Sequence, residues 1–370
     1  MTSLFDPISA GALHLPNRIA MAPLTRNRAP GALPNALMAT YYAQRASAGL
    51  IISEGTAISH QAQGYAQVPG LYSEEQLQGW KQVTKAVHAQ GGRIVTQLWH
   101  VGRVSHTVLQ PDNKAPVGPS AIAAHSKTYV INEETGQGHF VPTSVPRALH
   151  QDEIPGIVHS FAVAARSAVE SAGFDGVELH GANGYLLDQF LKTGANKRTD
   201  DYGGSIENRA RLTLECTRAV VDAVGGGKVG IRLSPVTPAN DIVDADPQPL
   251  FEYLVRELAP LGLAYIHIIE GSTGGPREIE DRPFDYGALK DAYRAAGGKG
   301  AWMVNNGYDR AMAMRAVESG HADIVAFGKA FISNPDLVHR LHDDLPLNAW
   351  NSSLFYGGGM EGYTDYPKVG

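Results

Sequence analysis

The stretch Asp175-Gly-Val-Glu-Leu-His180-Gly-Ala-Asn183-Gly-Tyr185-Leu186 decides how the whole chain is interpreted. Its apolar run at 176–179 predicts a buried strand, and a helix-like segment follows at once. Strand ends that turn directly into helices are where α/β enzymes place their chemistry. His180 and Asn183 are close enough to donate hydrogen bonds to one oxygen, and the phenol of Tyr185 is a proton donor two residues further on. Together they indicate a site for a substrate that develops negative charge on oxygen.

The same order of strand and helix runs through the chain. Eight apolar runs without alternation predict strands at residues 18–24, 50–53, 93–98, 176–179, 229–233, 264–269, 301–304 and 323–327. Eight helix-like stretches accompany them, at residues 37–48, 73–89, 151–172, 206–223, 247–259, 286–295, 310–319 and 335–341. This pattern predicts a parallel sheet covered by helices, and eight units predict an α/β fold of the (β/α)8 TIM-barrel type. An open doubly wound sheet is the alternative, but no strand-linked Gly-x-Gly-x-x-Gly element supports it.

The length of 370 residues suits one such barrel, so we expect residues 1–370 to form a single domain. Residues 8–13 predict an N-terminal β-hairpin that plugs one end of the barrel. Residues 103–150 are rich in Pro, Gly, Ser and Thr, which predicts a capping subdomain after the third strand. The glycines and tyrosines of residues 348–370 favour a segment that folds back across the site.

Composition excludes several classes of partner and site. The net charge of −6 is mild, so no basic surface is expected to hold nucleic acid or an anionic membrane. Cys216 is the only cysteine, which excludes an intrachain disulfide and cysteine-ligated zinc or iron–sulfur sites. His100 and His106 lack further ligands at a recognisable spacing, so no metal is expected. Without a signal peptide or a membrane-length run, we expect a cytoplasmic protein of undetermined oligomeric state.

The ends of the barrel strands predict one shared pocket. The candidate residues after the first five strands are Pro23, Leu24, Thr25, Gly55, Thr56, Ala57, Gln97, Trp99, His100, His180, Asn183, Tyr185 and Arg232. Their hydroxyl, amide, indole and guanidinium groups suit a large planar heterocycle better than hydrolysis. Alternation along the fourth strand places Glu178 on the same side as His180, as a buried partner rather than a glycosidase acid.

The last two strands indicate a phosphate site. They end in Val304-Asn-Asn306-Gly307-Tyr308 and in Phe327-Gly328-Lys329, and the corresponding barrel loops often bind phosphate through backbone N–H groups. Gly307 and Gly328 permit close approach of a ligand to the backbone, while Lys329 adds a positive charge. The pair of loops therefore favours phosphate over two unrelated turns.

Five motifs in this order resemble the Old Yellow Enzyme family of flavin-dependent ene-reductases. They are Met21-Ala-Pro-Leu-Thr-Arg26, Thr96-Gln-Leu-Trp-His100, His180-Gly-Ala-Asn-Gly-Tyr-Leu186, Asn196-Lys-Arg-Thr-Asp-Asp-Tyr-Gly-Gly-Ser-Ile-Glu-Asn-Arg209 and Ser333-Asn-Pro-Asp-Leu337. The resemblance runs from about the fourth residue to Tyr356.

The resemblance implies tightly bound, non-covalent FMN across the barrel mouth, with its phosphate at Asn306, Gly307, Gly328 and Lys329. Thr25 would bond to flavin O4, Gln97 to the pyrimidine edge, and Arg232 would stabilise charge near N1. The remaining residues implied to contact the cofactor are Pro23, Leu24, Ala57 and His180.

The resemblance also implies a ping-pong reaction in which NADPH or NADH reduces the flavin and an activated alkene then reoxidises it. His180 and Asn183 would hold the carbonyl or nitro oxygen, and Tyr185 would protonate the α-carbon. Tyr65, Trp99 and Tyr356 would form the pocket walls. Thr25 places the chain with the threonine-type members that carry a His/Asn substrate pair.

Several points remain open at the level of sequence. The family usually has arginine where this chain has Lys329, so phosphate would meet a point charge instead of a bidentate fork. The alternatives to an ene-reductase are a flavin-binding barrel that mainly reduces nitro compounds, nitrate esters or quinones, a non-catalytic flavin module, and a metal-free phosphosugar-binding barrel. The physiological substrate, the choice of nicotinamide and the stereoselectivity are not determined.

Overall fold

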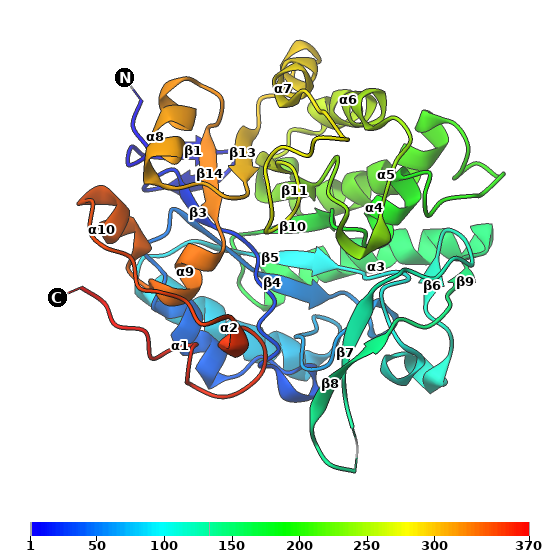
Figure 1. The fold of residues 1–370 in the computed structure, drawn as a ribbon, viewed down its shortest axis with the longest axis horizontal. Helices are drawn as coiled ribbons and strands as arrows, with labels where there is room; N and C mark the ends of the chain where they lie inside the picture. Colours follow the sequence, from blue (N-terminus) through cyan, green and yellow to red (C-terminus); the bar gives the residue numbers. More distant parts are fainter. Residues whose placement is uncertain (1, 133, 370) are drawn as a thin grey trace.

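The strands form a closed barrel of parallel neighbours (Figure 1). The computed structural model describes residues 2–132 and 134–369. Each barrel strand pairs with the next one in the chain, and the last returns to the first: β3 (Ile19–Met21), β4 (Leu50–Ala57), β5 (Ile94–Trp99), β10 (Gly176–Gly181), β11 (Val229–Leu233), β12 (Tyr265–Ile269), β13 (Ala301–Asn305) and β14 (Ile324–Phe327). The prediction of a (β/α)8 barrel is confirmed.

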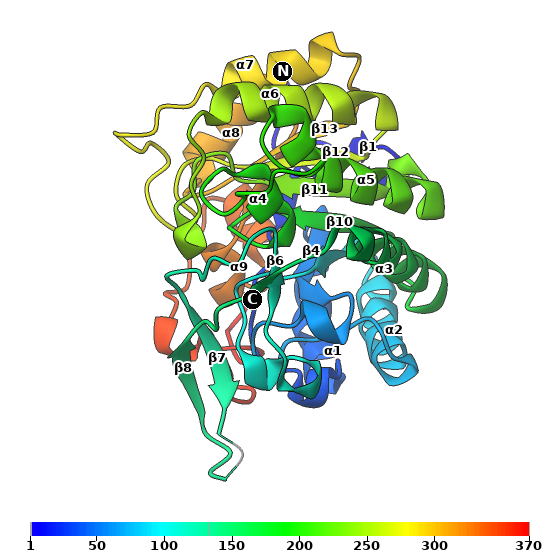
Figure 2. The ribbon, with the colours of Figure 1, turned by 90° about the vertical axis from the view of Figure 1, so that its right-hand side faces the viewer.

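Helices surround the barrel and bury their apolar faces against it (Figures 1 and 2). They are α1 (Ala36–Ala43), α2 (Glu74–Ala89), α3 (Ile154–Arg166), α4 (Leu186–Leu191), α5 (Ile206–Val224), α6 (Pro247–Leu258), α7 (Tyr286–Ala295), α8 (Arg310–Glu318), α9 (Lys329–Ser333) and α10 (Leu337–His342). Side-chain caps fix several starts: Ser73 forms a capping box with Gln76 at α2, and Asp309 accepts the Met312 N–H at α8. Among the described residues, no helix is both long and apolar enough to cross a bilayer.

A small antiparallel ribbon closes the amino-terminal end of the barrel. It consists of β1 (Ile8–Ala10) and β2 (Leu13–Leu15). Leu13 and Leu15 are buried in a cluster with inward-facing strand residues such as Leu50 and Val95. Because this end is filled with apolar side chains, the polar strand ends are left to form the opposite mouth.

The segment after β5 carries the remaining strands, which are β6 (Val117–Gly118), β7 (Lys127–Ile131), β8 (Gly138–Pro142) and β9 (Arg147–Ala148). β7 and β8 pair as an antiparallel ribbon that projects from the body in both views (Figures 1 and 2). β6 and β9 pair in parallel, and both residues of β6 are buried.

The carboxyl-terminal segment folds back onto the loop that follows β3. The guanidinium of Arg26 donates to the backbone oxygens of Phe355 and Gly362, both at 2.8 Å. Arg28 donates to the oxygens of Leu354 and Gly359, and the Gly357 N–H returns a bond to the Arg26 oxygen. Two buried arginines therefore hold this segment against the loop after β3, while its predicted path across the site stays a prediction.

The element boundaries differ from the prediction in ways that local chemistry explains. The strand predicted at 18–24 ends at Met21 because Pro23 has no N–H with which to continue the ladder. β4 runs to Ala57, four residues beyond its predicted end, past a register shift between Ile52 and Gly55. The polar residues around that shift look like a turn in sequence, although all of β4 is buried.

Candidate active site

The segment 180–185 brings three polar groups together at the carboxyl end of β10. His180 lies on the strand, Asn183 adopts a left-handed conformation with φ +58°, and Tyr185 precedes α4. The Asn183 N–H donates to the Ser234 hydroxyl at 2.8 Å, which ties this turn to the end of β11. Gly184 has φ +75°, and a Cβ there would lie 2.8 Å from the Ala239 oxygen, so the turn requires glycine.

The hydrogen bonds of His180 define which of its ring nitrogens can donate. The Ala182 N–H donates to Nδ1 at 3.3 Å, so Nδ1 is the acceptor and Nε2 carries the proton. Burial lowers the pKa of His180 well below its usual value, and the charge of Arg232 lowers it further. His180 is therefore a neutral imidazole with an Nε2–H donor.

A threonine in the loop after β12 orients the side chain of Asn183. The Thr273 hydroxyl donates to Asn183 Oδ1 at 2.6 Å, and Thr273 is in turn bonded to Thr237. Because Oδ1 is occupied, the Nδ2 group of Asn183 is the part that remains to donate. Thr273 was missed in the sequence because it lies ninety residues away in an irregular loop.

Aromatic side chains surround the phenol of Tyr185. Its hydroxyl lies 3.2 Å from the Tyr65 hydroxyl, and its ring packs edge-on against Trp99 at 4.9 Å. Tyr65 stacks on Trp99 at 5.5 Å, so these residues form one wall. Burial raises the pKa of Tyr185, which keeps the phenol protonated at neutral pH. Tyr356, in contrast, is 53% exposed, and its ring packs edge-on against Phe355.

A charged group, the guanidinium of Arg232, is buried on β11. Arg232 donates to Asn305 Oδ1 at 2.7 Å, and Asn305 Nδ2 donates to the Ala326 oxygen. Burial lowers the pKa of Arg232 to about 10, so the guanidinium remains charged at neutral pH. Its Nε has no hydrogen-bond partner within residues 2–132 and 134–369. Sequence analysis did not single out Asn305, which fixes the direction of this guanidinium.

The predicted contacts on the first two strands lie at the same mouth. Pro23, Leu24 and Thr25 are half-buried directly after β3. Ala57 is fully buried, and its N–H and oxygen already bond to Pro69 and Leu71. Thr25 is therefore the residue of this group that offers a side-chain hydroxyl to a ligand.

The predicted phosphate residues lie at the ends of the neighbouring strands β13 and β14. Gly307 has φ +66°, and a Cβ on Gly328 would meet only Leu24, at 3.4 Å. Lys329 Nζ reaches the Gly274 oxygen at 3.5 Å. The side chain of Asn306 instead holds the loop after β12, donating to the oxygens of Glu270 and Ser272 and accepting the Gly274 N–H. Asn306 therefore organises the loop with its side chain and has only backbone groups to offer a phosphate.

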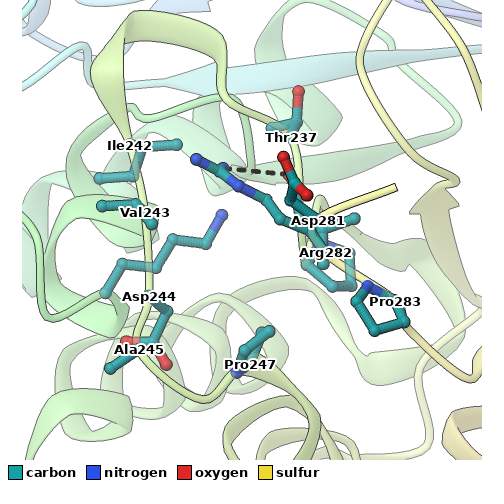
Figure 3. A pocket seen from close by; sticks show the side chains of 12 residues that line it. Thr237, Ile242, Val243, Asp244, Ala245, Pro247, Asp281, Arg282 and Pro283 are labelled. Atoms are coloured by element: carbon teal, nitrogen blue, oxygen red, sulfur yellow. Dashed lines mark hydrogen bonds between the residues drawn. The ribbon is translucent and has the colours of Figure 1, made fainter. Parts of the chain in front are cut away.

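A separate pocket of about 190 Å³ lies between the loops that follow β11 and β12 (Figure 3). Arg282 extends across it and donates to the Val236 oxygen at 3.5 Å. None of the predicted site residues lines this pocket. Its rim residue Thr237 is bonded to Thr273, so the pocket adjoins the support of Asn183 without being the reaction site.

The chain belongs to a family of flavin oxidoreductases. The model of the NADH:flavin oxidoreductase / NADH oxidase family matches residues 3–348. This match, with the relatives below, confirms the resemblance to the Old Yellow Enzyme family.

Relatives cover the chain almost completely. A putative 12-oxophytodienoate reductase 11 from Oryza sativa subsp. japonica is 43% identical over 366 residues, covering 98% of this chain and 97% of its own. The 12-oxophytodienoate reductase 2 of Arabidopsis thaliana is 41% identical, with coverage of 99% and 96%. The structure of morphinone reductase in complex with tetrahydroNAD is 48% identical, with a TM-score of 0.94 and coverage of 100% and 98%. An old yellow enzyme homologue from Zymomonas mobilis is 40% identical, with a TM-score of 0.93 and full coverage of both chains.

The residues at the barrel mouth fit the FMN of this family. The Nε of Arg232 is a buried donor without a partner in the described chain, beside the mouth where a heterocycle would develop negative charge. A Cβ on Gly307 would meet only the Arg277 side chain, at 3.6 Å, and one on Gly328 only Leu24, so a phosphate could approach the backbone beside Lys329. A buried cation at one end and an open glycine pair at the other match a charged heterocycle that carries a phosphate.

Proposed function

We propose that this chain is an FMN-dependent NAD(P)H:alkene oxidoreductase that reduces the C=C bond of α,β-unsaturated carbonyl or nitro compounds. The observation that carries this proposal is which side-chain groups of His180 and Asn183 remain free to donate hydrogen bonds. Their partners leave the Nε2–H of His180 and the NH₂ group of Asn183 free to donate, beside the half-buried hydroxyl of Tyr185. Two neutral donors and one acid suit a substrate whose oxygen gains charge while its neighbouring carbon gains a proton.

The cofactor would be held by residues from most of the barrel strands. Thr25 would bond to the flavin, Gln97 would hold its pyrimidine edge, and the charge of Arg232 would favour the reduced form. Gly307, Gly328 and Lys329 would hold the phosphate. Thr25, with the His180 and Asn183 pair, supports placing this chain with the threonine-type members.

The reaction needs one hydride and one proton. When bound, FMN supplies the two-electron carrier that takes a hydride from NAD(P)H and delivers it to the β-carbon. His180 Nε2 and Asn183 Nδ2 hold the activating oxygen, which draws electrons from that carbon. Tyr185 gives its proton to the α-carbon and regains one from solvent. In the overall reaction, NAD(P)H, a proton and the alkene are converted to NAD(P)⁺ and the saturated product by a ping-pong sequence.

The surroundings of the site would set its selectivity. Tyr65, Trp99 and Tyr356 form the walls of the substrate pocket in this proposal. Residues 103–150 act as its capping subdomain within the single domain 1–370.

The proposal is tested with the purified protein and two observations. We expect the protein to bind FMN and become yellow, and we expect NADPH or NADH to bleach it under anaerobic conditions. Addition of cyclohexenone should then restore the oxidised spectrum. A protein that gains no flavin spectrum with added FMN would contradict the proposal, while one that is reoxidised by quinones but not by cyclohexenone would identify a reductase of other electrophiles.

Lys329 is the charged residue that would contact the phosphate of FMN in this proposal. Lys329→Ala should weaken FMN binding by about tenfold, since one charge-assisted contact contributes roughly 1.5 kcal/mol. Titration of apoprotein with FMN, followed by quenching of flavin fluorescence, measures the dissociation constant. Lys299→Ala, on a surface turn before β13, is the control and should leave it unchanged. Equal constants for Lys329→Ala and the unaltered protein would remove Lys329 from the phosphate site.

A further inference from the structure

A fully buried carboxylate lies inside the barrel, beside one of the residues assigned to the cofactor. The side chain of Glu178 has no exposed surface. One of its oxygens accepts a hydrogen bond from Gln97 Nε2 and the other is bonded to His267 Nδ1, both at 2.8 Å. Glu178 and Gln97 are also direct neighbours in the register of β10 and β5. The carboxylate is therefore enclosed by defined partners on two strands.

These contacts determine how Gln97 presents its carboxamide. A carboxylate only accepts hydrogen bonds, so Gln97 must turn its NH₂ group toward Glu178. No other residue of the described chain bonds to the Gln97 side chain, which leaves its oxygen and its second N–H for a ligand. An acceptor and a donor in fixed positions match the alternating N–H and C=O groups of a pyrimidine edge.

The charge of Glu178 is not cancelled by its histidine partner. Because a carboxylate accepts, His267 must carry its proton on Nδ1, and Nε2 is then a bare acceptor without a partner among the described residues. Burial lowers the pKa of His267, so the ring is neutral at physiological pH. The other nearby ion is Arg232, whose pKa is raised by the charge of Glu178 against the larger effect of burial. Glu178 thus weakens the positive field that Arg232 directs to the mouth.

We propose that Glu178 is a positioning residue for the cofactor: it fixes the Gln97 carboxamide against the pyrimidine edge, and its charge lowers the two-electron reduction potential of bound FMN. This inference rests on the proposed function, because it requires FMN at the mouth. Reduction adds negative charge to the pyrimidine side of the flavin, which Arg232 favours and a buried carboxylate opposes. The balance between the two ions sets the potential.

Glu178→Gln separates charge from shape, because it deletes the charge and keeps an oxygen that can accept from Gln97. We expect the midpoint potential to rise, with at least a tenfold change in the equilibrium between the oxidised and reduced forms, equivalent to about 30 mV for two electrons. Anaerobic titration against a reference dye measures this without any alkene. His267→Asn, whose amide N–H can replace Nδ1, keeps the charge and should leave the potential close to that of the unaltered protein.

A second variant makes the test decisive. Glu178→Asp retains the charge, but its shorter side chain moves the carboxylate away from Gln97. This variant should therefore weaken FMN binding several-fold without raising the potential. An unchanged potential in Glu178→Gln would overturn the inference. If circular dichroism shows that Glu178→Gln does not fold, unchanged FMN affinity in Glu178→Asp would overturn it instead. Failure of the unaltered protein to bind FMN would instead contradict the proposed function, so the two failures are distinguishable.

Discussion

Replacing Tyr185 with phenylalanine should slow reoxidation of the reduced protein by cyclohexenone by 10²- to 10⁴-fold, the usual contribution of a positioned acid. Reduction by NAD(P)H should change by less than about threefold, because that step needs no proton from the phenol. Rapid-mixing absorbance measurements under anaerobic conditions follow the two steps separately. Equal losses in both steps would contradict the assignment of Tyr185 as the acid.

Tyr65→Phe is the matched control for this prediction. Its hydroxyl lies 3.2 Å from that of Tyr185, so the variant removes the same group from the neighbouring residue. We expect only a modest loss in the alkene step, because Tyr185 retains its own proton. If Tyr65→Phe were as slow as Tyr185→Phe, the proton would have to come from the pair rather than from Tyr185 alone.

The direction of the Tyr185 pKa adds a pH dependence. Burial raises that pKa above its ordinary value of about 10, despite the hydrogen bond with Tyr65. The acid form therefore persists as the pH rises, and the alkene step should not fall between pH 7 and pH 9. A decline with a midpoint inside that range would show that another group supplies the proton.

The barrel and much of the mouth were predictable because their signals are local. Non-alternating apolar runs followed by helices identify parallel strands, and every strand then delivers its last residues to the same end. Alternation along one strand was also enough to infer that Glu178 is buried on the side of His180. Its 2.8 Å bonds to Gln97 and His267 agree with that inference.

Other features depend on contacts that no local pattern encodes. Thr273 and Asn305 act through side chains far away in the sequence, Asn183 and Arg232, so neither has a motif of its own. The exposed position of Tyr356 depends on where the folded tail comes to rest. A polar residue on an irregular loop gains its role only when the fold brings a partner to it.

The same dependence on distant contacts applies to the ion pair of Asp188 and Lys192 on and just beyond α4. Both side chains are almost completely inaccessible, and Lys192 Nζ lies 3.1 Å from Asp188. Lys192 also donates to the Ser234 oxygen, while Asp188 accepts the Gly184 N–H. The pair therefore ties the turn that carries Asn183 to the end of β11.

Lys192→Met should lower the free energy of unfolding by about 3–5 kcal/mol, because Asp188 would be left as a buried charge without its partner. Arg256→Met is the matched control: Arg256 and Glu252 are also four residues apart and 2.7 Å from each other, but Arg256 is half exposed. That variant should cost at most about 1 kcal/mol. Urea unfolding of both variants as apoproteins measures the difference, and similar losses would contradict the role assigned to burial.

The pH dependence of the Lys192→Met variant identifies the source of its instability. Burial already raises the pKa of Asp188, and loss of the neighbouring ammonium should raise it further. A carboxyl whose folded-state pKa exceeds its unfolded value loses stability as the pH rises between the two values. The loss of unfolding free energy in Lys192→Met should therefore be smaller at pH 5 than at pH 8.

Asp188→Asn combined with Lys192→Met should recover part of the loss at pH 8, since the amide oxygen can still accept the Gly184 N–H without leaving a charge. If the double variant were no more stable than Lys192→Met, lost packing of the lysine stem would account for the instability instead of the unpaired carboxylate.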